Sequence, residues 1–124
     1  MQKFKILYLD DTPNSSIVFR FEHLFSPPVD ITVVTNITWA LEEMRSNDPF
    51  DVIISDGQLT EGDTGIIFYT QIKDVFRGNF ILFSASDEII KIGEELGIEI
   101  VPKGDSDFLF ETVKEILELK ISAN

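Results

Sequence analysis

The sequence predicts an α/β fold in which a parallel sheet lies between two layers of helices. Short runs rich in β-branched residues alternate five times with longer stretches in which apolar residues recur at helical spacing, the pattern of successive strand–helix units. Several runs are apolar throughout, which is typical of strands buried on both faces. Because crossovers between parallel strands are right-handed, such a chain folds as a doubly wound, three-layer sandwich.

The five strands are expected where the apolar runs lie, at residues 4–9, 31–35, 51–55, 80–84 and 99–101. The helices between and after them are predicted from apolar residues three or four positions apart. In chain order these groups are Ile17, Phe21 and Leu24; Ile37, Leu41 and Met44; Ile66, Tyr69, Ile72 and Phe76; Ile89, Ile92 and Leu96; and Leu109, Val113, Ile116 and Leu117.

Helix ends are predicted from short polar residues and glycines. We expect helices to begin at Asn14 or Ser15, at Ser86 and at Ser106, because these side chains can accept hydrogen bonds from the free N–H groups of a first turn. Gly78 and Gly97 are expected to end helices, since glycine tolerates the backbone conformation found there.

Length and composition limit the function classes. The 124 residues suit one domain, 1–124, with no output domain, and no apolar run approaches the roughly 18 residues that span a bilayer. With no cysteine, a metal would need oxygen ligands. The formal charge of −12 disfavours nucleic acid as a partner. We therefore expect a cytoplasmic protein that binds neither nucleic acid nor membrane.

Two of the predicted strands are followed directly by aspartates, Asp10 and Asp11 after the first and Asp56 after the third. The carboxyl ends of parallel strands meet at one edge of a sheet, which is where ligands bind in such folds. Two carboxylates about 5 Å apart repel by roughly 3 kcal/mol at an effective dielectric constant near 20, so three need a shared proton or a cation. Oxygen ligands of this kind favour Mg²⁺.

Two more polar residues are expected at the same edge, Ser84 at the end of the fourth strand and Lys103 beyond the fifth. Together the five groups suggest phosphoryl transfer. Asp56 is the candidate nucleophile, since a carboxylate can form an aspartyl phosphate. Asp11 would bind the metal directly and Asp10 through water, while Ser84 and Lys103 would stabilise charge on the transferred group.

These residues resemble the receiver domain of two-component response regulators over nearly the whole chain. The resemblance rests on Leu9-Asp10-Asp11, Ile54-Ser55-Asp56, Ser84-Ala85, Leu96-Gly97 and Lys103. It implies a flavodoxin-like sheet with strand order 2-1-3-4-5. It also implies phosphorylation of Asp56 by a histidine kinase or histidine phosphotransfer protein, Mg²⁺ held by Asp10, Asp11, Asp56 and the Gln58 backbone carbonyl, and signalling by docking to a downstream protein. A receiver phosphorylates and dephosphorylates itself rather than turning over a substrate.

Three positions depart from the family pattern and keep alternatives open. Thr60 stands where proline is usual, Gly104 follows the lysine in place of proline, and Ile100 replaces an aromatic residue that moves on activation. These favour a degenerate receiver that acts as a phosphorylation-independent interaction module. A phosphatase of the haloacid dehalogenase type is less favoured, because it needs two aspartates separated by one residue, whereas Asp10 and Asp11 are adjacent.

Overall fold

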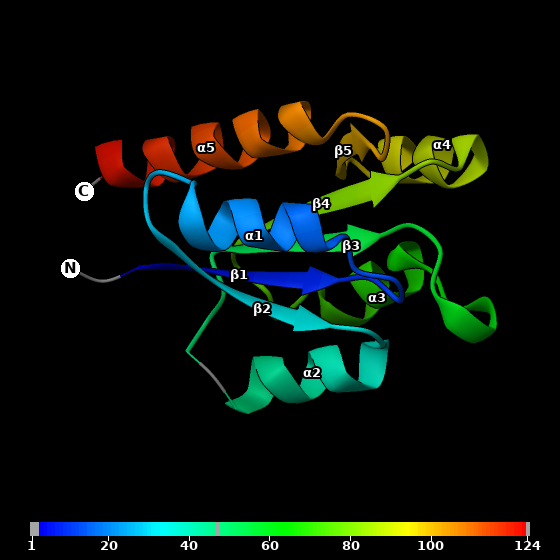
Figure 1. Cartoon of the computed structure of the whole chain (residues 1–124). Helices are drawn as coiled ribbons and strands as arrows, with labels where there is room; N and C mark the ends of the chain where they lie inside the picture. The colour runs from blue at the N-terminus through cyan, green and yellow to red at the C-terminus, as the bar shows by residue number, and fades with distance from the viewer. Residues whose placement is uncertain (1–2, 47, 124) are drawn as a thin grey trace.

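Five parallel strands form one sheet in the order β2-β1-β3-β4-β5, which confirms the expected topology (Figure 1). The computed structural model describes residues 3–46 and 48–123. The strands are β1 (Phe4–Leu9), β2 (Val29–Val34), β3 (Val52–Asp56), β4 (Asn79–Ser84) and β5 (Glu99–Pro102). Every predicted strand is present, with its ends shifted by two residues at most.

Helices cover both faces of the sheet. Over the described residues they are α1 (Ser15–His23), α2 (Ile37–Ser46), α3 (Gly65–Ile72), α4 (Asp87–Glu95) and α5 (Ser106–Ser122), and a 3₁₀ turn, η1 (Thr60–Gly62), precedes α3. Helices α1 and α5 pack on one face, and α2, α3 and α4 pack on the other (Figure 1). None of the helices in these ranges is long and apolar enough to cross a membrane.

The alternation of side chains along β1 assigns its residues to the two cores. Ile6 and Tyr8 pack with residues of α1 and α5, whereas Leu7 and Leu9 pack with residues of α2 and α3. All four are fully buried. The two cores hold β1 from both faces, and the residues that follow Leu9 are thereby placed at the carboxyl edge of the sheet.

Helix ends agree with the sequence at some positions and differ at others. Asn14 caps α1 and Ser86 caps α4, as predicted. The cap of α5 is Asp105 rather than Ser106, and its carboxylate accepts a hydrogen bond from the Phe108 N–H at 3.0 Å. Gly97 follows the C-cap of α4 with a φ of 76°, a left-handed conformation that favours glycine.

Three residues predicted on apolar helix faces are exposed instead. Leu24 and Leu96 are 70% and 46% exposed, because each lies just beyond the last turn of its helix. Ile92 is 41% exposed, since α4 buries Ile89 and Gly93 against the sheet and turns Ile92 away. The expected face of α4 was therefore wrong by part of a turn.

Gly78 does not end a helix, because α3 stops at Ile72. Gly78 lies instead in the turn before β4, where the backbone approaches Asp51 so closely that a Cβ atom would collide with the Asp51 carbonyl oxygen and lie 2.6 Å from the ring of Phe76. The requirement for glycine here comes from packing against a distant segment.

Replacing Gly78 with alanine is expected to lower the free energy of unfolding by about 1–3 kcal/mol, because the added methyl group forces the backbone apart. Urea denaturation measures the change. Gly104→Ala is the matched control, since a Cβ atom there meets nothing within 4 Å and the variant should be as stable as the wild type or slightly more so. Equal stability of the two variants would contradict this account of Gly78.

Candidate functional site

The carboxyl ends of β1 and β3 bring three aspartates together. Leu9 pairs with Ser55 in the sheet, so Asp10 and Asp56 are neighbours, and Asp11 follows. Carboxylate oxygens of Asp10, Asp11 and Asp56 lie within 4.8 Å of one another. Asp10 and Asp56 are 1% and 6% exposed, whereas Asp11 faces solvent. The predicted acidic cluster is present.

Lys103 enters this cluster from the end of β5. Its Nζ lies 2.9 Å from Asp56 Oδ2 and 3.2 Å from Asp10 Oδ2. Its backbone N–H donates to the carbonyl of Ser84 at 2.9 Å, which holds the two strand ends side by side. Three carboxylates and one ammonium leave two formal negative charges, so the side chains present match a divalent cation in charge and in ligand type.

Burial and neighbouring charges perturb the ionisation of Asp56 and Lys103. Burial raises the pKa of the Asp56 carboxyl; the hydrogen bond from Lys103 opposes this increase, and the charge of Asp10 adds to it. Burial alone would lower the pKa of the Lys103 ammonium, but hydrogen bonds and charges from Asp56 and Asp10 outweigh it, so that pKa is raised. The ammonium therefore stays charged while one of its partners resists ionisation.

Ser84 lies against the backbone that follows Asp56. A Cβ atom on Gly57 would collide with Ser84 Oγ and lie 2.6 Å from its Cβ, so only glycine allows this approach. Ser84 Oγ accepts a hydrogen bond from the Ser86 N–H at 3.1 Å, which leaves the hydroxyl proton free to donate. Ser84, Asp56 and Lys103 all line one cavity of about 660 Å³.

The loop after β3 closes one side of this cavity. Gln58 and Thr64 form an antiparallel bridge, and the N–H of Leu59 donates to the carbonyl of Asp63 at 2.9 Å. The N–H of Gln58 points to Asp56 Oδ1 at 3.4 Å. Thr60, where the receiver pattern has proline, begins the short η1 turn. The role of the Gln58 carbonyl as a metal ligand stays a prediction.

Tyr8 and Thr12 also belong to the site, although neither was predicted from the sequence as a site residue. The Tyr8 hydroxyl donates to Asp10 Oδ2 at 3.0 Å, and the Thr12 N–H donates to Asp10 Oδ1 at 2.9 Å. Burial, followed by the charge of Asp10, raises the pKa of the Tyr8 phenol well above its ordinary value. The available signal was the spacing, because residues two apart on a strand share a face.

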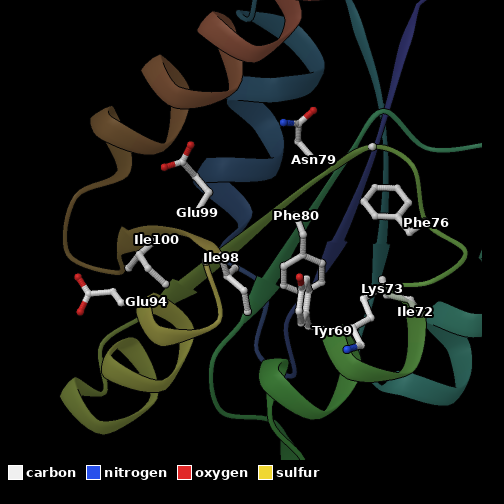
Figure 2. Close-up of a pocket in the computed structure, with 12 residues that line it drawn as sticks. Tyr69, Ile72, Lys73, Phe76, Asn79, Phe80, Glu94, Ile98, Glu99 and Ile100 are labelled. Atoms are coloured by element: carbon white, nitrogen blue, oxygen red, sulfur yellow. The ribbon is translucent and has the colours of Figure 1, made fainter.

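A larger cavity, of about 720 Å³, lies at the opposite, amino ends of β4 and β5 (Figure 2). Tyr69 of α3 and Lys73, the C-cap of that helix, line it together with Phe80, Glu94 and Glu99. None of the site residues predicted from the sequence lines it. Ile100, one of the three departures from the receiver pattern, does line it and also packs against Gly93 of α4. The smaller cavity is the better candidate because it contains the convergent charged groups.

No family model matches the chain, and no curated protein matches it in sequence. Solved structures do match. The signal receiver domain of an HD domain-containing protein from Pseudomonas fluorescens Pf-5 is 24% identical, with a TM-score of 0.76, over 98% of this chain and 99% of that one. The chain has the fold of a receiver domain.

Two further receiver structures agree. The receiver domain of a putative LuxO repressor protein from Vibrio parahaemolyticus has a TM-score of 0.78 at 19% identity, over 98% of this chain and 96% of its own. The receiver domain of the Francisella response regulator 1452 has a TM-score of 0.74 at 24% identity, over 95% and 99%. The receiver fold thus spans nearly the whole chain.

Proposed function

We propose that this chain is a phosphoacceptor receiver in which Asp56 takes up a phosphoryl group in a Mg²⁺-dependent reaction. The observation that carries the proposal is the cluster itself: a buried carboxylate at the end of a central strand, 2.9 Å from a lysine ammonium and next to two further carboxylates. The donor is a histidine kinase or a histidine phosphotransfer protein, and the recipient of the signal is another protein in the cytoplasm.

The metal would be held by the carboxylates of Asp10, Asp11 and Asp56 and by the Gln58 backbone carbonyl. Bound Mg²⁺ supplies charge neutralisation for the phosphoryl oxygens. The cluster fits this ion because its oxygen atoms are already gathered within 4.8 Å and its excess charge is that of a divalent cation. Asp11 is the exposed member and gives the ion access from solvent.

Asp56, Lys103 and Ser84 have separate roles in the transfer of the phosphoryl group. A carboxylate oxygen of Asp56 forms the bond to phosphorus, while the bond between phosphorus and the donor group breaks. Lys103 already contacts Asp56 Oδ2, so its ammonium is placed to stabilise the negative charge of the phosphoryl oxygens once the group is bound to Asp56. The Ser84 hydroxyl, from the neighbouring strand, donates to the same group. Hydrolysis of the aspartyl phosphate resets the site, so the protein is a switch and not a turnover enzyme.

The protein incubated with Mg²⁺ and acetyl phosphate is expected to gain one phosphoryl group, seen by intact-mass measurement and mapped to Asp56 after borohydride trapping. The adduct should not form in EDTA, because Asp10, Asp11 and Asp56 then repel the anionic donor. A protein that gains no phosphoryl group, or one modified at another residue, would contradict the proposed function.

Ile100 favours a second candidate function, that of a receiver fold acting as a phosphorylation-independent interaction module. The residue packs against Gly93 and offers no aromatic ring to swing between two positions. The affinity of this chain for a protein partner isolated by affinity capture, measured with and without Mg²⁺ plus beryllofluoride, distinguishes the two candidate functions. An affinity that depends on beryllofluoride supports the phosphorylated switch, and an unchanged affinity supports the module.

A further inference from the structure

Tyr8 places a hydroxyl group inside an otherwise apolar core. Its ring is fully buried among residues of α1, α5 and the central strands, and its neighbours Ile6 and Ile54 on the same face of the sheet are aliphatic. Phenylalanine would fill the same space without bringing a polar atom out of water. The hydroxyl therefore needs its own explanation, and its short contact is with Asp10.

The contacts of the Asp10 carboxylate are divided between its two oxygens. Oδ2 accepts from the Tyr8 hydroxyl at 3.0 Å and lies 3.2 Å from Lys103 Nζ, while Oδ1 accepts from the Thr12 N–H at 2.9 Å. A carboxylate oxygen has two lone pairs, so Oδ2 is fully used and Oδ1 keeps one free position. The Tyr8 hydroxyl thus helps to decide which oxygen of Asp10 can face a cation.

The hydrogen bond from Tyr8 to Asp10 also affects the position of the Lys103 ammonium. Its ammonium is shared between Asp10 Oδ2 and Asp56 Oδ2, and the two distances differ by only a few tenths of an ångström. By donating to Asp10 Oδ2, the Tyr8 hydroxyl partly satisfies that oxygen and keeps it from drawing the ammonium away from Asp56. The N–H of Asn14 approaches the Tyr8 oxygen at 3.5 Å from the other side.

We propose that Tyr8 is a positioning residue for the metal and phosphoryl chemistry, which acts through Asp10 by holding its carboxylate in the orientation that leaves one Oδ1 position for Mg²⁺. The inference rests on the proposed function and adds a residue to it. Groups that hold metal-ligating carboxylates from behind change metal affinity about 10–100-fold when they are removed.

The test is the Mg²⁺ dependence of phosphorylation by acetyl phosphate in the wild type and in Tyr8→Phe. The variant is expected to need about tenfold more Mg²⁺ for half-maximal rate and to reach a maximal rate close to that of the wild type. Tyr69→Phe is the matched control, because Tyr69 lines the cavity at the far end of the sheet (Figure 2) and its hydroxyl bonds to no other described residue. Its Mg²⁺ dependence should not change.

A second measurement separates positioning from packing. Tyr8→Phe in an Asp10→Asn background should cause no further shift, because the group through which Tyr8 acts is already altered. An unshifted Mg²⁺ dependence in Tyr8→Phe, or a lower maximal rate without a shift, would overturn the inference while leaving the proposed function intact. Failure of the wild type itself to be phosphorylated overturns both.

Thermal melting establishes that Tyr8→Phe is folded before these rates are compared. A measurement on the wild type alone needs no variant: the Tyr8 hydroxyl proton should exchange slowly with solvent in NMR spectra and shift when Mg²⁺ is added. A proton that exchanges rapidly, or a signal indifferent to Mg²⁺, contradicts the positioning role.

Discussion

Asp56→Asn is expected to abolish the phosphoryl adduct completely while making the metal-free protein more stable at neutral pH. The amide has no anionic oxygen to form the bond to phosphorus, so the loss of the adduct should be total. Stability should increase because burial and the charge of Asp10 disfavour the ionised carboxylate in the folded state. Asparagine keeps the shape of aspartate and removes that charge.

The raised pKa of Asp56 determines how the stability difference between Asp56→Asn and the wild type changes with pH. The folded-state pKa of Asp56 lies above the value of 3.8 that serves for the unfolded chain, so the folded protein binds the proton more tightly. The resulting stabilisation is complete below pH 3.8 and is lost as the pH rises through the raised pKa. The advantage of Asp56→Asn should therefore be largest at neutral pH and shrink as the pH falls.

Urea denaturation from neutral pH towards pH 4, in EDTA, measures this difference. Asp63→Asn is the matched control, because Asp63 is an exposed acid that lines the same cavity. Asp63→Asn should change neither the yield of the phosphoryl adduct nor the pH dependence of the free energy of unfolding appreciably. An Asp56→Asn protein that is less stable than the wild type at neutral pH would show that the Lys103 ion pair outweighs burial and the Asp10 charge.

Much of the site was predictable because a parallel sheet converts sequence position into spatial position. Residues that end neighbouring parallel strands must meet at one edge, so Asp10, Asp56 and Lys103 could be placed together once their strands were recognised. The strand order itself came from the resemblance to receiver domains and was not determined by the apolar runs. The structure brings together all of the side chains that the sequence selected.

The parts that could not be predicted depend on contacts between distant segments. Gly78 was predicted to end a helix, but the structure requires glycine there because the backbone of Asp51, from a distant segment, leaves no room for a Cβ atom. Ile92 matched a helical stripe, yet Gly93 determines which face of α4 lies on the sheet. Tyr8 was grouped with the apolar strand residues; its spacing from Asp10 places the two residues on one face, but the hydrogen bond between them is evident only in the structure.

Lys103→Met is expected to lower the free energy of unfolding of the metal-free protein by about 2 kcal/mol. Methionine keeps much of the length of the side chain, but Asp10 and Asp56 lose the ammonium that contacts them at 3.2 and 2.9 Å. Breaking a fully buried ion pair costs about 3–5 kcal/mol, and the effect here is smaller because the Lys103 side chain is one-third exposed. Urea denaturation in EDTA measures the loss.

Two dependences should distinguish lost charge from lost packing in Lys103→Met. Mg²⁺ should stabilise this variant more than the wild type, because the cation replaces the missing positive charge among the three carboxylates. The contribution of Lys103 to stability is fully present below pH 10.5 and is lost as the pH rises through its raised folded-state pKa, so the stabilities of wild type and variant should converge at high pH.

Lys73→Met, at the far cavity (Figure 2), is the matched control and should show neither effect. If Mg²⁺ stabilised all three proteins equally, Lys103 would be a packing residue, and the charge balance on which the metal site depends would have to be abandoned.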